Sequence, residues 1–583
     1  MKTTNFFNKV AYLLSDDARK IPFFIVLVLL LSIIDLIGIG MIGPYLSIIL
    51  QPENLKNDFQ FLEFIFSRFE SVDSVVISLS FLLIIIFAIK TIGGILLNRL
   101  ILKFCYTQGL KLRTFLMDAY QNLPYEEYLE RNSSEYIFNM QVLTEQYFKQ
   151  ILQSILRIGS ESIVIVLISL LLIWTDFIAF LTLFILMTTS LLIYDFSFRR
   201  KLTNYGEKSN ENSVKLTRGI QEGMNGIKEI RVLKKENYFY DLVKTGAEKY
   251  REVNVKHQVI AAAPRYFLEL IVISFIALIT AINLYQGKNL NDLLPVLGMF
   301  GVASIRILPS INQIIGGLVQ IRYGNNAIDI LFKDYKKLKN HLNFENSSKL
   351  KKNKKDKKIH HFNSIRVEDI SFKYKDNAIS TISNLSFSLH KGECIGIVGH
   401  SGAGKTTFID ILLGLLKPTK GNIFYNEDLI EGRENLWISK VAYIPQDVFL
   451  IDDSLKNNIT LSSDNEYYNE KKLMLSIEKA RLSDLSKQLP QGINTKLGDN
   501  GLRVSGGQKQ RVALARAFYH DREVLIMDES TSSLDKETEK EIVDEIKRLQ
   551  GTISMVIISH NMETIEHCDK VYEIKSGTIK LIK

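Results

Sequence analysis

The sequence predicts two fused domains of different class, an α-helical membrane domain followed by an α/β domain with a mainly parallel sheet. Three observations predict this division. Residues 1–325 contain long apolar runs, and a bilayer-spanning helix needs about 20 apolar residues. From about Ser364, short β-branched runs alternate with helical patterns. One of these strands runs directly into a glycine-rich loop and a helix. We therefore expect domains at 1–330 and 364–583, joined by a linker at 331–363.

The length and the charge distribution agree with this division. A chain of 583 residues is too long for a single core. Its net charge of +9 could indicate a nucleic-acid partner, but the stretch from Lys333 to Lys358 alone holds +8. A lysine run between domains predicts a solvated linker, with attraction to anionic lipid headgroups as the alternative. The three cysteines show no metal-like spacing, so reduced, unpaired thiols are expected.

The membrane domain contains six apolar runs that could each span a bilayer. The first run is too long for a cleavable signal and lacks a small-residue cleavage pattern. Positive charge gathers in the polar stretch 199–257, and 51–74 is acidic, which predicts that both termini and the α/β domain are cytoplasmic. The expected spans are about Ile21–Leu50, Val75–Leu102, Gln153–Trp174, Phe177–Phe198, Val259–Tyr285 and Leu294–Ile321.

Two polar stretches, 103–150 and 199–257, have helical patterns and should extend the spans into the cytosol, where the α/β domain could dock. Within the second, "NGIKEIRVLKKENYFYDL" predicts an amphipathic helix, with Ile227, Ile230 and Leu233 on its apolar face. On the opposite side of the membrane, "NDFQFLEFIFSRFESV" is rich in phenylalanine. It is predicted either to contact lipid or to pack on the outer loops.

The strand "ECIGIVG" leads into "GHSGAGKTT", which matches the phosphate-binding pattern G-x-x-x-x-G-K-[ST] between a strand and a helix. Backbone amides of such a loop surround the β-phosphate, Lys405 supplies a positive charge, and Thr406 offers an oxygen to Mg²⁺. The predicted nucleotide-binding residues of the loop are Gly399, Ser401, Gly402, Ala403, Gly404, Lys405, Thr406 and Thr407.

Three further strands deliver polar residues to the same sheet edge. "EVLIMDES" ends in Asp528, expected to hold Mg²⁺, and Glu529, expected to orient and polarise the attacking water. "SMVIISH" delivers His560 toward the γ-phosphate, and "VAYIPQD" delivers Gln446 toward metal or water. The prediction is ATP hydrolysis with Mg²⁺. Its catalytic residues would be Glu529, His560, Lys405 and Gln446, and its metal ligands Thr406, Gln446 and Asp528.

About a hundred residues after the phosphate loop, "VSGGQKQRVALARAF" predicts a second phosphate-facing element. Ser505 and Gln508 fit a capping box, so a helix should begin there with exposed amides. The C-terminal 220 residues resemble the ATP-binding domain of ABC transporters, whose signature loop corresponds to Ser505, Gly506, Gly507 and Gln508.

That resemblance implies that the signature loop of one chain closes over ATP bound to a partner chain. With six spans and one loop of each kind, the chain resembles a half-transporter of the exporter type that works as a homodimer. The expected fold class is thus a six-span exporter membrane domain fused to a P-loop NTPase domain of the ABC type. The family pattern further implies that Tyr374 stacks on adenine and that Asp535 lies at the dimer seam.

Charged residues inside the spans predict the cargo, because ionisable groups at membrane depth are costly and usually functional or paired. Lys90, Arg265 and Arg306 could form a belt for phosphate or pyrophosphate. The alternative is internal pairing with Asp35, Glu161 or Glu269. Arg157 lies one helical turn from Glu161, which predicts a structural pair.

The segments "LPYEEYLERNSSEYIFNM", "AAAPRYFLEL" and "GVASIRILPSINQI" are similar to parts of the PglK-type flippases. This resemblance implies an oligosaccharide linked to polyprenyl pyrophosphate as cargo, moved from the cytoplasmic to the outer leaflet of a bacterial inner membrane for protein or cell-surface glycosylation. The alternatives are an exporter of lipid A, a drug or a peptide, and an ATP-gated channel or sensor. Six spans argue against a soluble ATPase that acts on nucleic acid, so no nucleic-acid partner is expected.

Overall fold

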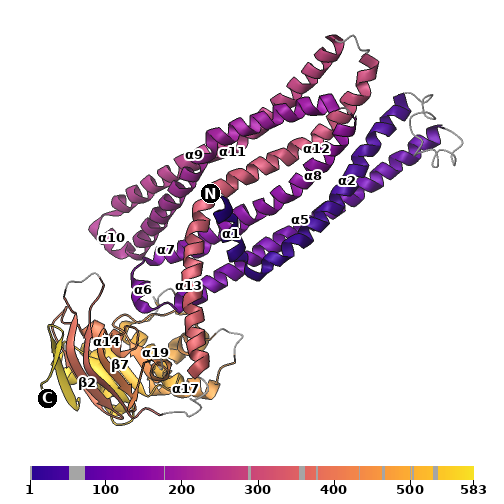
Figure 1. Ribbon diagram of the computed structural model, residues 1–583. Helices are drawn as coiled ribbons and strands as arrows, with labels where there is room; N and C mark the ends of the chain where they lie inside the picture. The colour runs from indigo at the N-terminus through magenta and orange to yellow at the C-terminus, as the bar shows by residue number, and fades with distance from the viewer. Residues whose placement is uncertain are drawn as a thin grey trace. The chain divides into compact units, whose positions relative to one another are not determined.

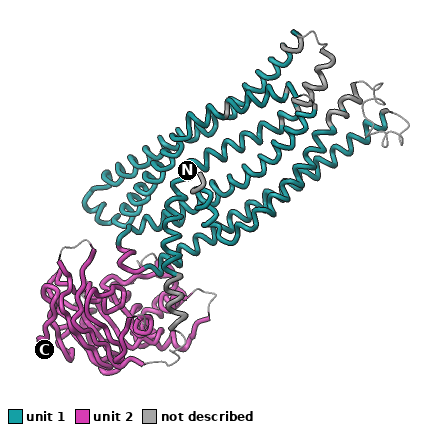
Figure 2. Tube along the Cα trace, in the orientation of Figure 1, with its two compact units in different colours: residues 1–123, 130–344 teal, residues 124–129, 345–583 magenta. Residues whose placement is uncertain are grey.

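The computed structural model describes residues 3–50, 72–175, 177–285, 290–352, 361–375, 379–431, 434–462, 467–498, 501, 504–529 and 536–583. Figure 2 shows two compact units, one of Met1–Leu123 with Glu130–Phe344 and one of Pro124–Leu129 with Glu345–Lys583. The unit boundary lies after the start of the expected linker, because helix α13 (Asn325–Lys352) continues through it and buries Leu331 and Leu338 in the helical core.

Among its described residues, the first unit has helices as its only regular secondary structure, joined by short turns. Its long helices lie side by side (Figure 1). The elements before α13 are α1 (Thr3–Leu14), the 3-10 helix η1 (Ser15–Lys20), α2 (Ile21–Leu50), α5 (Val72–Gln121), α7 (Ser133–Phe138), the π-helices η4 (Asn139–Leu143) and η5 (Gln146–Leu152), α8 (Gln153–Thr175), α9 (Phe177–Asn225), α10 (Ile227–Leu233), α11 (Glu236–Tyr285) and α12 (Leu290–Tyr323).

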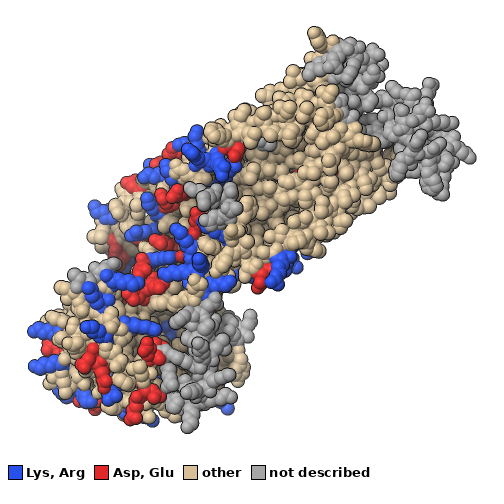
Figure 3. Space-filling view, in the orientation of Figure 1, with Lys and Arg blue, Asp and Glu red and all other residues tan. Residues whose placement is uncertain are grey.

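Among the described residues, five helices are long and apolar enough to cross a membrane: Phe6–Met41, Asp73–Gln121, Ser133–Trp174, Phe180–Asn225 and Glu236–Ala281. They contain the first five expected spans in full or over most of their length. The sixth, Leu294–Ile321, lies within α12, where part of the side chains is outside the described set. Figure 3 shows the charged residues of this unit gathered toward one end, with a largely uncharged surface over the rest. This distribution fits helices that extend from a bilayer into water.

The segment predicted as one amphipathic helix after Asn225 is two helices, so that prediction was wrong in this respect. α10 ends at Leu233 and is followed by its C-cap residue Lys234, whose φ of +52° lies in the left-handed region, and α11 begins at Glu236. None of the residues of α10 is buried. The phenylalanine-rich segment lies outside the described residues except for its last residue, Val72.

The second unit is the expected α/β domain. A six-stranded sheet has the order β10-β9-β3-β8-β7-β6, and β9, β3, β8, β7 and β6 run parallel. A second, antiparallel sheet has the order β2-β1-β4-β5. The strands are β1 (Ser364–Phe372), β2 (Ile382–His390), β3 (Cys394–Val398), β4 (Lys420–Tyr425), β5 (Asp428–Leu429), β6 (Val441–Ile444), β7 (Val524–Asp528), β8 (Ser554–Ile558), β9 (Lys570–Lys575) and β10 (Thr578–Leu581).

Parallel strands end at the same edge, so the loops after β3, β6, β7 and β8 meet there. Strands β3, β7 and β8 are buried along almost their whole length, as expected for strands covered on both faces. The helices of this unit are α6 (Tyr125–Leu129), α14 (Lys405–Leu412), α15 (Glu434–Ile438), α16 (Leu455–Thr460), α17 (Glu470–Lys479), α18 (Ser483–Gln488), η6 (Gly492–Asn494), α19 (Gly506–Tyr519), α20 (Lys536–Leu549) and α21 (Met562–Ile565).

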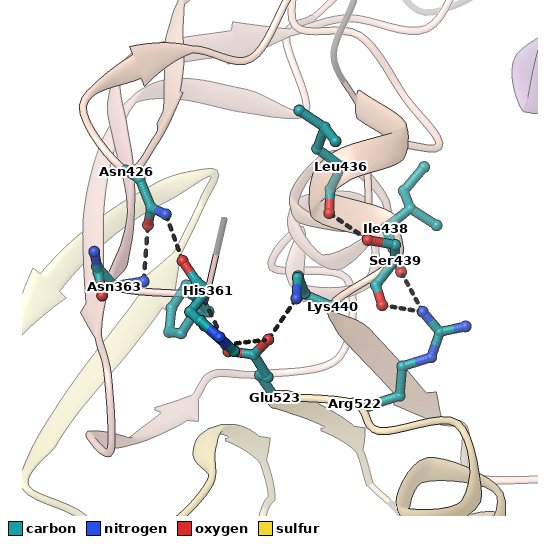
Figure 4. Close-up of polar contacts among 10 residues, drawn as sticks. His361, Asn363, Asn426, Leu436, Ile438, Ser439, Lys440, Arg522 and Glu523 are labelled. Carbon is teal, nitrogen blue, oxygen red and sulfur yellow. Dashed lines mark hydrogen bonds and ion pairs between the residues drawn. The ribbon is translucent and has the colours of Figure 1, made fainter. Parts of the chain in front are cut away.

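Glu523, just before β7, fixes the segment by which the chain enters the α/β domain (Figure 4). Its carboxylate accepts a hydrogen bond from the backbone of Phe362 at 2.9 Å and one from Lys440 Nζ at 2.5 Å. His361 Nδ1 lies 3.6 Å from the same carboxylate. Asn426 adds a bond from its amide to the His361 carbonyl at 2.6 Å. The entry segment is therefore held against the strands that carry the functional residues.

Gly206 of α9 allows close packing against α12, which generates a prediction. A methyl group at this position would clash with the carbonyl oxygen of Tyr323, whereas one at Gly94 of α5 would meet no atom within 4 Å. Overpacking costs about 1–3 kcal/mol, and glycine to alanine in a free helix position gains up to about 1 kcal/mol. We expect Gly206→Ala to lower the thermal unfolding temperature of the detergent-purified protein, with Gly94→Ala as the matched control. Equal unfolding temperatures of the two variants would contradict this close packing of α9 against α12.

Candidate functional site

The glycine-rich loop lies between β3 and α14, as predicted. Gly404 has φ of +103°, a conformation that L side chains rarely adopt. A methyl group at Gly399 would collide with the carbonyl oxygen of Ile574. Lys405 begins α14 and is only 7% exposed, and its Nζ donates to the Gly399 carbonyl at 2.7 Å. The backbone thus curls around a buried cation at the start of a helix, which is the geometry of a phosphate site.

Two neighbouring strands bring the predicted catalytic residues to this cation. Glu529 follows β7, and its Oε1 lies 3.4 Å from Lys405 Nζ. His560 follows β8, and its Nε2 lies 2.6 Å from the same carboxylate oxygen and 3.3 Å from Lys405 Nζ. Glu529 has φ of +44°, in the left-handed region, so the backbone turns sharply where the strand ends. The structure therefore brings Lys405, Glu529 and His560 together, although they are far apart in the sequence.

The predicted Mg²⁺ ligands supply oxygen atoms, the donors that this ion prefers. Asp528 is half-buried at the end of β7, while Thr406 in the first turn of α14 and Gln446 after β6 are exposed. Tyr443, which is not among the predicted site residues, donates a hydrogen bond from its hydroxyl to Asp528 Oδ2 at 3.2 Å. These residues fit a hard cation, which when bound would neutralise charge on the phosphates.

Burial raises the pKa values of two carboxyl groups at this edge of the sheet, Asp528 and Asp410. Desolvation raises the pKa of Asp528, and the charge of Glu529 adds to the rise, while the bond from Tyr443 and the charge of Lys405 oppose it. Desolvation and the nearby Asp528 raise the pKa of Asp410, in α14, to about 6. Two acids in a low-dielectric site favour a bound cation, because the cation removes their repulsion.

Tyr374 lies beside the loop, where the family pattern places a base-stacking residue. Its hydroxyl is 3.3 Å from Thr407 Oγ1, and its ring packs edge-on against Phe372 with centroids 4.9 Å apart. It is half-buried, so one part of the ring remains accessible. Its stacking role stays a prediction. Asp535 lies outside the described residues.

The signature loop begins α19 with the predicted capping box. Ser505 Oγ accepts from the Gln508 backbone at 3.4 Å, and Gln508 Oε1 accepts from the Ser505 backbone at 2.9 Å. Ser505 and Gly506 are exposed, so the amide end of this helix faces solvent, while Gly507 is buried.

A cavity of about 520 Å³ adjoins this helix end. Residues from two segments line it: Gln446, Asp447, Val448 and Phe449 after β6, and Val504, Gly506, Lys509 and Gln510 at the signature loop. Gln446 therefore lines the same cavity as the start of α19.

The structure brings two of the three predicted substrate cations onto one buried carboxylate. Asp35 of α2 is 3% exposed, with Lys90 Nζ of α5 at 2.5 Å and Arg306 Nε of α12 at 2.7 Å. Arg265 instead pairs with Glu269 one turn away at 3.1 Å, on the exposed side of α11. The internal pairing considered from the sequence is therefore present for all three cations.

The expected pair of Arg157 and Glu161 is not present among the described residues. Glu161 instead accepts a hydrogen bond from the Ser310 hydroxyl at 2.5 Å, so α8 is tied to α12. The sequence prediction failed because a helical spacing of four residues permits a contact without requiring it.

Two protein-family models match this chain. Residues 21–291 match the model described as ABC transporter transmembrane region, and residues 382–532 match the model described as ABC transporter. The chain is also similar to a solved structure of a bacterial Atm1-family ABC exporter with ATP bound, at a TM-score of 0.72 over 97% of this chain and 95% of that one. At 18% identity this likeness shows a shared fold.

Curated relatives match only part of their own length. An ATP-dependent lipid A-core flippase of Ralstonia nicotianae is 33% identical over 37% of each chain. A multidrug resistance-like ATP-binding protein, MdlA, of Buchnera aphidicola is 38% identical over 36% of each. The lipid A-core flippase of Paraburkholderia xenovorans is 27% identical over 62% of this chain and 59% of its own length. The matches thus span less than two thirds of these relatives.

The Glu529 contacts generate a prediction about catalysis. Glu529→Gln keeps the size of the side chain but removes its charge, so ATP should still bind while hydrolysis falls by at least about 100-fold. Phosphate release and binding of a fluorescent ATP analogue measure the two effects. Glu563→Gln, on the exposed first turn of nearby α21, is the matched control. Turnover within a few fold of the wild type would assign the water-activating role to another group.

The raised pKa of Asp410 generates a prediction about stability. Between an ordinary pKa near 4 and about 6, the folded state binds more protons than the unfolded state. The ionised carboxylate therefore lowers stability at neutral pH, and this penalty disappears as the pH falls toward 4. We expect Asp410→Asn to raise the unfolding temperature near pH 7 but not near pH 4. Asp452→Asn, at an exposed position, should have no such pH-dependent effect.

Proposed function

We propose that this ABC half-transporter, a chain with one transmembrane region and one ATP-binding domain, couples ATP hydrolysis to export of a lipid with an anionic headgroup. The observation that carries the ATPase part is the meeting of Lys405, Glu529 and His560 within 3.4 Å of one another at the edge of the parallel sheet. Phosphoryl transfer requires positioning and charge neutralisation, and a buried lysine with an adjacent carboxylate and imidazole supplies both.

The working unit that we propose is a homodimer with two equivalent ATP sites. The capped and exposed start of α19 suits the γ-phosphate of a nucleotide held by a partner chain. Helix α10 is consistent with the same arrangement, because Val232 and Leu233 are 77% and 67% exposed in the single chain. Phe449, which lines the cavity beside the signature loop, is 66% exposed in the single chain, so the α/β domain also presents apolar surface. Closing of the pair around ATP would then move the membrane helices.

We further propose that the cargo is an oligosaccharide on a polyprenyl pyrophosphate, moved from the cytoplasmic to the outer leaflet of a bacterial inner membrane. At Asp35, the two cations Lys90 and Arg306 face one carboxylate, so this cluster holds one surplus positive charge. Arg265 is paired separately with Glu269. A pyrophosphate could exchange for the internal carboxylates as a counter-ion. The flippase names of the relatives support lipid export.

The relatives also favour a second candidate, lipid A, which presents phosphate groups on a different lipid. The test is a flipping assay in proteoliposomes that contain either a defined pyrophosphate-linked glycan, lipid A or a zwitterionic phospholipid, with Glu529→Gln as the inactive control. ATP-dependent flipping of the pyrophosphate-linked glycan supports the proposal. Flipping of lipid A alone would favour the second candidate. ATP turnover that no lipid changes would favour a gate or sensor.

The ion cluster at Asp35 generates a prediction about the cargo. Changing Lys90, Arg265 and Arg306 to glutamine together with Asp35→Asn removes the cations without leaving an unpaired buried carboxylate. Since a charged hydrogen bond contributes about 1.5–3 kcal/mol, lipids flipped per ATP hydrolysed should fall at least about tenfold. Glu145→Gln with Lys149→Gln removes an exposed ion pair as the matched control. An unchanged ratio in the first variant would exclude these cations from cargo binding.

A further inference from the structure

Three side chains that play no part in the nucleotide site meet inside the α/β domain. Cys394 is the first residue of β3 and is fully buried, and Cys568, just before β9, is 1% exposed. Their sulfur atoms lie 3.1 Å apart. His567 offers a ring nitrogen, and the three possible ligand atoms all lie within 4.8 Å of one another. Cys394 and Cys568 are more than 170 positions apart in the sequence, so the cluster cannot be predicted from a short sequence motif.

The imidazole of His567 is the second notable feature of this cluster. Both ring nitrogens are buried, and neither has a hydrogen-bond partner among the described residues. A buried polar atom without a partner costs about 1–3 kcal/mol, so such an atom calls for an explanation. A ligand bound to one of the nitrogens would provide it.

The backbone around the cluster is held by hydrogen bonds from three separate parts of the chain. Asp569 Oδ2 accepts from the Cys394 backbone at 2.8 Å. The Gln550 amide donates to the His567 carbonyl at 3.2 Å. Lys583 Nζ donates to the Cys568 carbonyl at 3.1 Å. The backbone positions from which the three side chains project are therefore fixed by the fold, as a binding site requires.

We propose that Cys394, Cys568 and His567 form a site for a single soft metal ion of the Zn²⁺ or Cu⁺ type. Two sulfur donors and one imidazole nitrogen are the ligands that such ions select over Mg²⁺. In a tetrahedral zinc site with Zn–S bonds of 2.3 Å, the two sulfurs lie about 3.8 Å apart, so they need to separate by less than an ångström. Binding displaces the two thiol protons to solvent, and the metal keeps its charge state. A disulfide between the cysteines would leave the imidazole without a partner.

The site lies at the opposite end of β3 from the phosphate loop. Cys394 begins the strand, and the loop starts at Gly399 directly after its last residue. The metal would therefore connect β3 to the start of β9 and stabilise the domain without taking part in ATP hydrolysis. The expected signature of binding is a higher unfolding temperature.

The test uses the reduced, metal-free full chain in detergent and Cd²⁺ alone as the probe, because its bonds to thiolate absorb in the ultraviolet. We expect one Cd²⁺ per chain with a thiolate absorption band and a raised unfolding temperature. Cys568→Ala and His567→Gln should each weaken binding at least about tenfold, since even loss of a supporting residue has that effect. Cys105→Ala, at a buried cysteine of the helical unit, is the matched control and should bind like the wild type.

Three results would overturn the proposal. They are absence of the absorption band in the wild type, retention of full binding in Cys568→Ala, and equal loss of binding in Cys105→Ala. Thiol titration of the unfolded, unreduced chain adds a fourth: a disulfide between Cys394 and Cys568 would remove both thiolate ligands from the proposed site. His567→Gln replaces a half-buried residue and avoids the core change of Cys568→Ala, so a folding defect in one variant leaves the other informative.

Discussion

The nucleotide site depends on one electrostatic constraint, a lysine held away from water at the end of a parallel sheet. Lys405 is almost fully buried, and burial of a charge is costly unless other charges or dipoles compensate it. The Gly399 carbonyl and the Glu529 carboxylate provide this compensation within 3.4 Å. The triphosphate of ATP offers a stronger counter-charge at the same place. Nucleotide binding can therefore exchange the internal contacts of Lys405 for contacts with phosphate.

The membrane unit shows the same type of constraint in a different environment. Asp35 of α2 forms ion pairs with Lys90 of α5 and Arg306 of α12, so the three helices are joined by ion pairs as well as by packing. Removing one member of such a cluster lowers stability more than replacing all of its members with uncharged residues, because the single removal leaves an unpaired buried charge. An anionic headgroup that enters this region would compete with Asp35 for its two partners. Ion pairing that stabilises the helices and ion exchange that binds cargo are thus compatible functions of the same residues.

The sequence was most informative where function depends on short contiguous patterns. The phosphate loop, the acidic end of β7, His560 and the capping box of Ser505 follow from strand ends and local motifs, and the structure has them at the expected places. The choice of partner for Asp35 depends on how three helices pack, which no local pattern encodes. The break at Lys234 was missed because lysine has no intrinsic preference for the left-handed region. The contact of Tyr443 with Asp528 and the cluster around His567 arise from strand register across the sheet.

In the proposed homodimer, each ATP is enclosed by the phosphate loop of one chain and the signature loop of another. Ser401 and Ser505 are both exposed, so a cysteine at either position is open to a short bismaleimide. Chains with Ser401→Cys and chains with Ser505→Cys, both in the Glu529→Gln background, are mixed and treated in the presence and absence of ATP. We expect an ATP-dependent crosslink between two chains that carry different substitutions. A mixture without any crosslinked pair would contradict it, and so would a chain that carries both substitutions and crosslinks only within itself.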